Sequence, residues 1–340
     1  MPSLSVILPI YNGAKFLDQQ IQSIQAQSLT DWCMLVCDDG STDNSMAVVE
    51  RLASNDKRIH VIPTTGNQGQ RRRLKQLADA TRTELIAIAD QDDIWAPDKL
   101  ALLTEAIGDA DMCFGPSWLI DEKGQEYGRF LADSLMPAYA DGERLTLMMR
   151  SFVSAHAMVA RRGLFNEMVF GRAKPFDWLM SLEAAWGNGI VYVPQAVTRH
   201  RMHGGNQANG MFAQTPNRPR VLSRAAFRTL PRRVERGRMH LMAMLEHMSF
   251  AENVSADWRQ RCAVARQICE DGWYSFVPGA YRAANRSLLD QLDAQLRPIA
   301  GHDRDWRYFH SLLETLCTPT YSPARLGARR RRIEFEWDKG

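Results

Sequence analysis

The chain has 340 residues, of which 45% are hydrophobic and 24% are charged. This composition is that of an ordinary folded protein and excludes a disordered or collagen-like chain. No uninterrupted apolar run approaches about 18 residues, so we expect no transmembrane helix, and the first residues lack the basic start of a signal peptide. The six cysteines include no CxxC pair, which favours reduced thiols in a cytoplasmic protein over a zinc or disulfide framework.

Strand and helix patterns alternate along the first hundred residues. Continuous apolar runs bounded by turn residues predict strands at 4–10, 32–37, 59–62 and 85–89. Helical spacing follows each of them, beginning with Leu17, Ile21 and Ile24, and further segments predict helices near 44–52, 72–80 and 98–107 and strands at 152–159 and 190–193. Such alternation predicts an α/β fold with a mostly parallel central sheet flanked by helices.

Unusual polar residues follow three of these strands. The first strand ends in Tyr11-Asn12-Gly13, the second in Asp38-Asp39-Gly40, and the fourth in the run Asp90 to Asp93. Ligands of open α/β sheets bind at the carboxyl ends of strands, and converging carboxylates can hold Mg²⁺ or Mn²⁺, which would neutralise a diphosphate leaving group. Aspartates after a strand also form turns or cap helices, so that interpretation stays open, for Asp93 in particular.

At these residues the sequence resembles the inverting family-two glycosyltransferases, which have the GT-A fold. The matching segments in the first hundred residues are SVILPIYNG, CDDGSTDNS, NQG followed by a basic helix, and IADQDDIWAPDKL; later ones are VSAHAMVARR, KPFDWLMSLEAAWGNGIVYVP and RHRMHGGNQ. Together they extend to about residue 210. The DQDDIW segment, and FDW with HGGN, are similar to those of bacterial rhamnosyltransferases and related polysaccharide transferases.

The resemblance implies a role for each matched position. It implies donor binding by a set of residues at the strand ends and in the basic helix, namely Pro9, Tyr11, Asp39, Arg72, Asp90 and Gln91. Asp39 would accept a hydrogen bond from the uracil or thymine imide, and Arg72 would reach the diphosphate. Asp92, Asp90 and His203 would hold the metal ion, Mg²⁺ or Mn²⁺.

The resemblance also implies a catalytic base, Asp177, which would deprotonate the acceptor hydroxyl. Inversion at an anomeric carbon needs such a base, and apolar Trp178 beside it offers a way to desolvate the carboxylate and raise its pKa. Trp178 and His156 are the expected acceptor-side residues. Asp177 can equally cap the helix that follows it, and the two roles are compatible.

The expected reaction is therefore inverting, metal-dependent transfer from a dTDP- or UDP-sugar, with dTDP-L-rhamnose or a UDP-hexose as donor. The acceptor would be a glycan or lipid-linked saccharide in bacterial surface polysaccharide synthesis. A catalytically inactive transferase-like binding module remains an alternative. A sugar nucleotidyltransferase would carry a glycine-rich loop with a lysine after the first strand, and a dinucleotide oxidoreductase would carry GxGxxG there; this chain has neither, and no nucleic-acid-binding module is recognisable.

The charge of +3 is unevenly distributed. Residues 216–340 contain 22 Lys and Arg against 14 Asp and Glu, a net charge of +8, whereas residues 1–215 contain 20 against 25, a net charge of −5. We expect a GT-A catalytic domain over 1–215 and a basic, mainly helical region over 216–340. Its arginines at 220, 224, 228 and 232 share one helical face, which could lie on the inner face of an anionic membrane or form the solvated side of a docked helix.

Overall fold

The computed structural model describes residues 2–129, 147–148, 153–171, 175–204, 230–252, 254–272 and 290–300. The chain divides into two compact units, one of residues 1–220 with 250–256 and the other of residues 221–249 with 257–340. The predicted boundary at residue 215 and the arginine positions 220, 224 and 228 lie outside the described residues. Both therefore stay predictions.

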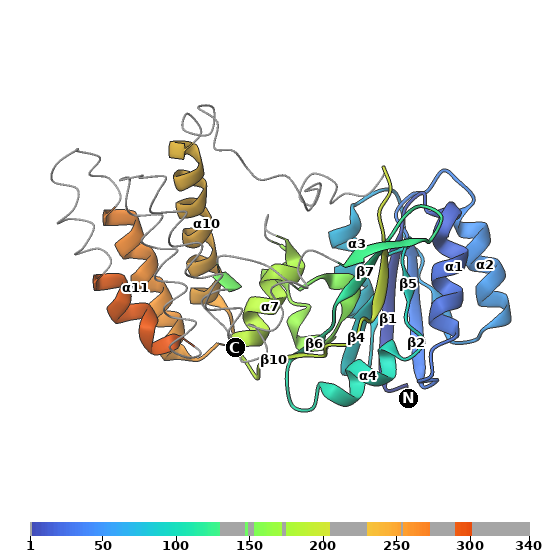
Figure 1. Cartoon of the computed structure of the whole chain (residues 1–340), viewed down its shortest axis with the longest axis horizontal. Helices are drawn as coiled ribbons and strands as arrows, with labels where there is room; N and C mark the ends of the chain where they lie inside the picture. The colour runs from blue at the N-terminus through green and yellow to red at the C-terminus, as the bar shows by residue number, and fades with distance from the viewer. Residues whose placement is uncertain are drawn as a thin grey trace. The chain divides into compact units, whose positions relative to one another are not determined.

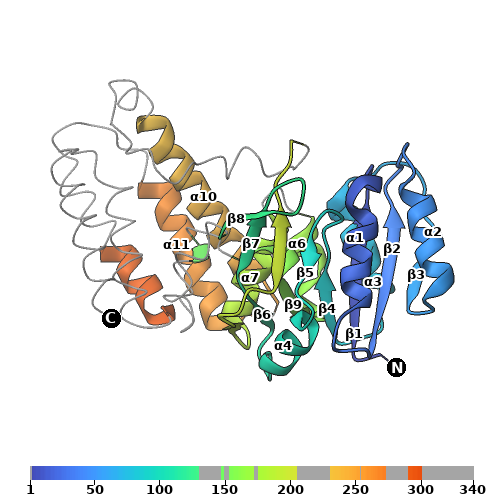
Figure 2. The same cartoon turned by 45° about the vertical axis from the view of Figure 1, so that its right-hand side comes forward.

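A seven-stranded sheet forms the centre of the first unit, with strands in the order β10-β6-β9-β4-β1-β2-β3 (Figures 1 and 2). Only β9 runs antiparallel to its two neighbours, and the other pairs are parallel. The predicted α/β fold with a mostly parallel sheet is confirmed. The strands span β1 (Leu4–Ile10), β2 (Trp32–Asp38), β3 (Ile59–Val61), β4 (Leu85–Ile88), β6 (Met112–Phe114), β9 (Met158–Arg161) and β10 (Ile190–Tyr192).

Helices α1 and α2 contact each other and lie side by side in Figures 1 and 2, while α3 packs against β1 and β2. Leu17, Ile21 and Ile24 of α1 are fully buried, as their helical spacing predicts, because one apolar face of the helix covers the sheet. The helices of this unit are α1 (Ala14–Gln25), α2 (Ser45–Asn55), α3 (Gln70–Ala80), α4 (Lys99–Ala106), α6 (Glu167–Phe170) and α7 (Phe176–Trp186).

A second, four-stranded sheet has the order β5-β11-β7-β8 and was not predicted. It contains β5 (Ile94–Trp95), β7 (Ser117–Ile120), β8 (Glu126–Arg129) and β11 (Thr198–Arg201). Strand β11 pairs antiparallel with β5 and parallel with β7. This pairing brings residues 198–203 beside the acidic run that follows β4.

The strand predicted at 152–159 is wrong in its bounds. Residues Ala155–Ala157 form a 3₁₀ turn (η2), and the strand β9 covers Met158–Arg161 instead; residue 152 lies outside the described residues. The carbonyl of His156 accepts hydrogen bonds from the side chains of Lys99 and Thr198. Because this carbonyl already accepts hydrogen bonds from two side chains, we infer that the strand begins only after it, at Met158. Another 3₁₀ turn, η3 (Arg162–Leu164), follows the strand.

The described part of the second unit is helical, as predicted. It contains α10 (Leu230–Phe250), α11 (Ala256–Gly272) and a 3₁₀ turn, η4 (Arg297–Ile299). Its buried residues include Leu241, Met244, Leu245, Cys262 and Leu292. In the parts of the chain that the structure describes, no helix combines the length and apolar character that crossing a membrane requires.

Candidate functional site

The carboxyl ends of β1, β2 and β4 meet at one edge of the seven-stranded sheet, because these three strands are parallel neighbours. Tyr11, Asp39 and Asp90 follow β1, β2 and β4 closely at this edge. The sequence interpretation placed the ligand site at this edge, and the topology brings the three strand ends together there.

The side chain of Gln91 joins the ends of β1 and β4. Its Oε1 accepts a hydrogen bond from the backbone N–H of Tyr11 at 2.9 Å, and its Nε2 donates to the Tyr11 carbonyl at 3.0 Å. Gln91 thus holds the backbone of Tyr11, a residue that is 49% exposed. Pro9 lies within β1 and is buried.

Asp39 is buried and already has three hydrogen-bond donors. Its carboxylate accepts the backbone N–H groups of Gln68 and Gly69 at 2.7 and 2.8 Å and pairs with Arg73 Nε at 2.8 Å. The side chains of Asp39 and Arg73 are 5% and 2% exposed. Asp39 therefore anchors the loop before α3, and its predicted contact with a nucleobase imide stays a prediction.

The three consecutive arginines of α3 have three different surroundings. Arg73 is buried against Asp39, and its outer nitrogens donate to Gln76 and to the carbonyls of residues 65 and 66. Arg71 donates to the carbonyls of residues 169 and 170, and its charge acts on Asp177. Arg72, the predicted diphosphate ligand, is exposed on the helix surface, where a donor could meet it.

Asp92 and His203 lie in direct contact, although 111 residues separate them in the sequence. The distance between His203 Nε2 and Asp92 Oδ2 is 2.7 Å, and the two side chains are 18% and 15% exposed. The His203 ring also packs on Phe16 of α1, with ring centroids 5.0 Å apart. The carboxylate oxygen and the imidazole nitrogen are both partly exposed, and both are groups that can ligate a divalent cation; the carboxylate is a ligand that Mn²⁺ and Mg²⁺ accept.

Asp90 lies beside this pair, and the pKa values of Asp90 and Asp92 are both raised. Burial, with the charges of Asp93 and Asp92, raises the pKa of Asp90 to about 7. Burial and the charge of Asp93 also raise the pKa of Asp92. Like charges held in a partly buried setting repel one another, and a bound cation would offset that repulsion.

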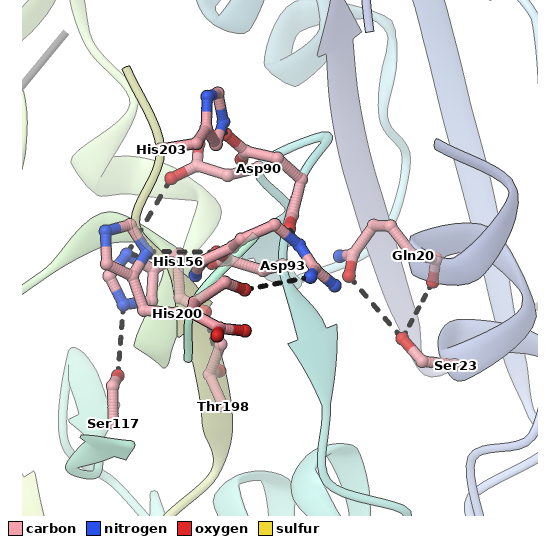
Figure 3. A network of polar contacts seen from close by, with 12 residues as sticks. Gln20, Ser23, Asp90, Asp93, Ser117, His156, Thr198, His200 and His203 are labelled. Atoms are coloured by element: carbon pink, nitrogen blue, oxygen red, sulfur yellow. Dashed lines mark hydrogen bonds and ion pairs between the residues drawn. The ribbon is translucent and has the colours of Figure 1, made fainter. Parts of the chain in front are cut away.

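A buried network of four side chains lies behind the acids (Figure 3). Asp93 Oδ1 accepts from His200 Nδ1 at 2.9 Å, and the rings of His200 and His156 are stacked with centroids 4.4 Å apart. His156 Nε2 lies 3.0 Å from Ser117 Oγ. Asp93 is completely buried, so it does not cap a helix at the surface. His156 is also buried, and its predicted acceptor-side contact stays a prediction.

Burial and direct contacts shift the pKa values of the groups in this network and so decide which of them are charged. Burial alone would raise the pKa of Asp93, but the charges of His200 and His156 hold it at about 2. Burial alone would lower the pKa of His200, but the charge and hydrogen bond of Asp93 raise it to about 9. Burial and the charge of His200 lower the pKa of His156 to about 3. Asp93 and His200 therefore form an ion pair, and burial disfavours the protonated form of His156.

Lys99, at the first position of α4, was missed by the sequence interpretation. Its ammonium group is completely buried, donates to the His156 carbonyl and to Thr198 Oγ1, and lies 3.6 Å from the centre of the Trp95 ring. Burial lowers its pKa well below the ordinary lysine value. A lysine that starts an amphipathic helix usually points to solvent, so no local sequence pattern indicates this role.

Asp177 lies in the first turn of α7 and has a raised pKa. Burial raises the pKa to about 6, although the backbone N–H groups of Trp178 and Ala155 and the charge of Arg71 lower it. Its charge in turn acts on Asp90, which places the two carboxylates in one electrostatic environment. The indole N–H of Trp178 donates to the carbonyl of Leu147, and its predicted acceptor-side contact stays a prediction.

Part of the chain is similar to known proteins. Residues 5–169 match the Glycosyl transferase family 2 description. An uncharacterized glycosyltransferase of Haemophilus influenzae is 35% identical over 100 residues, which is 29% of this chain and 40% of that protein. TuaG of Bacillus subtilis, named for teichuronic acid biosynthesis, is 27% identical over 149 residues, which is 43% of this chain and 59% of TuaG. The chain thus spans about half the length of the relatives that it matches.

The fold also has solved counterparts. A crystal structure of S. aureus TarS in complex with UDP-GlcNAc superposes with a TM-score of 0.53 at 15% identity, over 92% of this chain and 91% of that one. At this identity the likeness establishes the fold alone. It confirms the GT-A fold expected from the sequence.

Proposed function

We propose that the protein is an inverting glycosyltransferase, because residues 5–169 match the Glycosyl transferase family 2 description. It moves a sugar from a nucleotide diphosphate donor to a glycan or lipid-linked saccharide. One observation carries the proposal: Asp92 and His203 are in contact at 2.7 Å, beside an Asp90 whose charge interacts with that of Asp177. Three distant segments thus bring candidate metal ligands and a candidate base to one edge of the sheet.

In the proposed reaction Asp177 acts as the base. The acceptor hydroxyl oxygen bonds to the anomeric carbon, the bond from that carbon to the diphosphate breaks, and the hydroxyl proton passes to the Asp177 carboxylate. A pKa raised to about 6 by burial supports this role, because a base works best when its pKa lies near the working pH. Arg71, whose charge acts on the same carboxylate, keeps enough of it ionised to accept the proton.

The donor binds at the ends of β1 and β4 in this proposal. Tyr11 and Pro9 lie near the nucleobase of the donor, with Gln91 holding Tyr11 in place, and exposed Arg72 reaches the diphosphate. The carboxylate of Asp39 accepts a hydrogen bond from the nucleobase through its remaining acceptor capacity. Asp92, Asp90 and His203 hold Mg²⁺ or Mn²⁺, an ion that would neutralise the charge of the diphosphate as it leaves.

The donor is a dTDP- or UDP-sugar, with dTDP-L-rhamnose or a UDP-hexose as the leading candidates. The similarity of DQDDIW and of FDW with HGGN to rhamnosyltransferases supports the first. The name of the relative TuaG, which refers to teichuronic acid, supports an acceptor in bacterial surface polysaccharide synthesis.

Thermal stabilisation by a panel of dTDP- and UDP-sugars, with and without Mn²⁺, tests the proposal. A ligand that binds only the native state raises the melting temperature, since stabilisation by linkage grows with ligand concentration over Kd. We expect a Mn²⁺-dependent increase with one donor and its loss in Asp92→Ala. The absence of any shift with every donor and metal would favour a module without transferase function.

We further propose that the protein lies in the cytoplasm and binds peripherally to the inner face of the cell membrane. Support comes from the net charge of +8 in residues 216–340, since basic segments are attracted to anionic lipid. We expect cosedimentation with anionic liposomes that weakens with salt and is lost when Arg224, Arg228 and Arg232 are changed to Gln. The matched control changes Lys57, Arg82 and Arg162, exposed residues of the first unit, to Gln; equal loss in both variants would contradict membrane binding by the basic region.

A further inference from the structure

Asp93 connects the acidic run to the end of β11. It follows Asp92 directly and is completely buried, and its Oδ1 atom accepts two hydrogen bonds, from His200 Nδ1 at 2.9 Å and from the Arg201 backbone N–H at 3.0 Å. Both donors precede His203 by only two or three residues. The position of His203 is therefore tied to the residue that follows Asp92.

Arg201 also links β11 to the acidic run, here by a side chain of β11 that contacts the backbone of Asp92. Its guanidinium is buried, and its Nε donates to the carbonyl of Asp92 at 2.8 Å. Its outer nitrogens donate to the carbonyls of Asp121 and Glu122 at 3.2 and 3.0 Å and to Gln19 Oε1 at 2.7 Å. Arg201 thus fixes the backbone of Asp92 against α1 and the turn between β7 and β8.

The buried network is not itself arranged around an ion. Asp90, Asp93, His156 and His200 offer ligand atoms within 4.8 Å of one another, but the two imidazole rings are stacked and only 6° from parallel. A metal ion binds in the plane of an imidazole along its nitrogen lone pair. An ion in the plane of one stacked ring lies outside the plane of the other, so the two rings cannot both ligate it.

We infer that Asp93 and Arg201 are positioning residues for cation binding: they hold β11 against residues 90–92 so that Asp92 and His203 meet at one ion. This inference rests on the proposed function, since it takes Asp92 and His203 as the ligands. Partners of this kind orient the ligands of many metal sites, and removing them typically lowers metal affinity about 10- to 100-fold.

The test measures Mn²⁺ binding to the full-length protein by electron paramagnetic resonance, which reports free Mn²⁺ and needs no turnover. Asp93→Ala removes both hydrogen bonds of the Oδ1 atom and is expected to raise the Kd for Mn²⁺ about 10- to 100-fold. Asp93→Asn keeps a carbonyl oxygen that can accept both, and is expected to restore binding close to that of the wild type. Restoration by Asn assigns the effect to hydrogen bonding rather than to the charge of Asp93.

Asp111→Ala is the matched control. Asp111 is a buried aspartate that accepts two hydrogen bonds from Asn188. It precedes β6 and so lies at the edge of the seven-stranded sheet opposite the site. We expect its Kd for Mn²⁺ to be unchanged. If Asp93→Ala does not fold, Arg201→Lys provides the second variant, because a lysine keeps the charge but cannot make the four contacts of the guanidinium.

Unchanged Mn²⁺ affinity in folded Asp93→Ala or in Arg201→Lys would overturn the inference, and so would a wild-type protein that binds no Mn²⁺. Failure of the proposed function has a different signature. In that case the wild type binds Mn²⁺ and Asp93→Ala binds it weakly, but no nucleotide sugar stabilises either protein.

Discussion

At the scale of single residues, the environment of Asp177 leads to a pH dependence. The pKa of about 6 lies above the ordinary aspartate value, and a base must be ionised before it accepts a proton. We therefore expect kcat/KM to be level above about pH 6 and to fall about tenfold per pH unit below it. Initial rates with the stabilising donor, measured from pH 4.5 to about 8.5, check this prediction.

Two neighbouring arginines provide the control for that profile. The charge of Arg71 lowers the pKa of Asp177, so Arg71→Gln should move the inflection to higher pH. Arg72 is exposed, and Arg71 is the arginine whose charge is a main cause of the lowering at Asp177, so Arg72→Gln should leave the inflection in place even if it weakens donor binding. Identical profiles for the two variants would mean that Asp177 is not the titrating base.

The sequence indicates some of these residues and conceals others. Asp90, Asp92 and Asp177 stand out because carboxylates at a strand end or before a helix belong to a recognisable pattern. The roles of Asp93, Lys99 and His200 depend on partners about a hundred positions away: 107 residues separate Asp93 from His200, and 99 separate Lys99 from Thr198. Local patterns carry no information about such pairs.

At the scale of elements, the missing side chain of Gly13 leaves room for Gln91, which joins the ends of β1 and β4. A Cβ atom on Gly13 would lie 2.4 Å from Gln91 Oε1, so Gly13→Ala must displace the Gln91 side chain and break its two hydrogen bonds to Tyr11. We expect this variant to lose about 1–3 kcal/mol of stability and to have a higher KM for the donor. Urea unfolding and initial rates measure the two effects.

Gly163→Ala is the control for this substitution. No atom lies within 4 Å of a Cβ at Gly163, which occupies the turn η3. The same chemical change there should leave the stability within about 0.5 kcal/mol of the wild type. Equal stability of the two variants would show that the link between Tyr11 and Gln91 contributes nothing.

The elements differ in how well the sequence predicts them. Strands β1, β2 and β4 are buried on both faces, so each reads as a continuous apolar run, and their predicted bounds match the structure closely. Strands β5 and β11 have two and four residues, and the sequence of β11 is TRHR. A short polar strand forms because of the strands on either side of it, which a sequence window cannot show.

At the scale of the whole chain, the candidate site depends on long-range topology. Residues 90–93, 155–157, 177 and 198–203 come together because β11 inserts between β5 and β7 while β9 inserts antiparallel between β4 and β6. The family resemblance predicted which segments belong to the site. It did not predict that a second sheet would bring His203 to Asp92.

In the proposed reaction a sugar is transferred at this edge of the sheet, with Asp177 as the base. Release of nucleoside diphosphate from the stabilising donor, compared between the wild type and Asp177→Asn, tests this role of Asp177. We predict that Asp177→Asn keeps the thermal shift with the donor and loses at least about 10²-fold in kcat, because a positioned base typically contributes that much. Release at the wild-type rate by Asp177→Asn, with the donor bound equally well, would exclude Asp177 as the base.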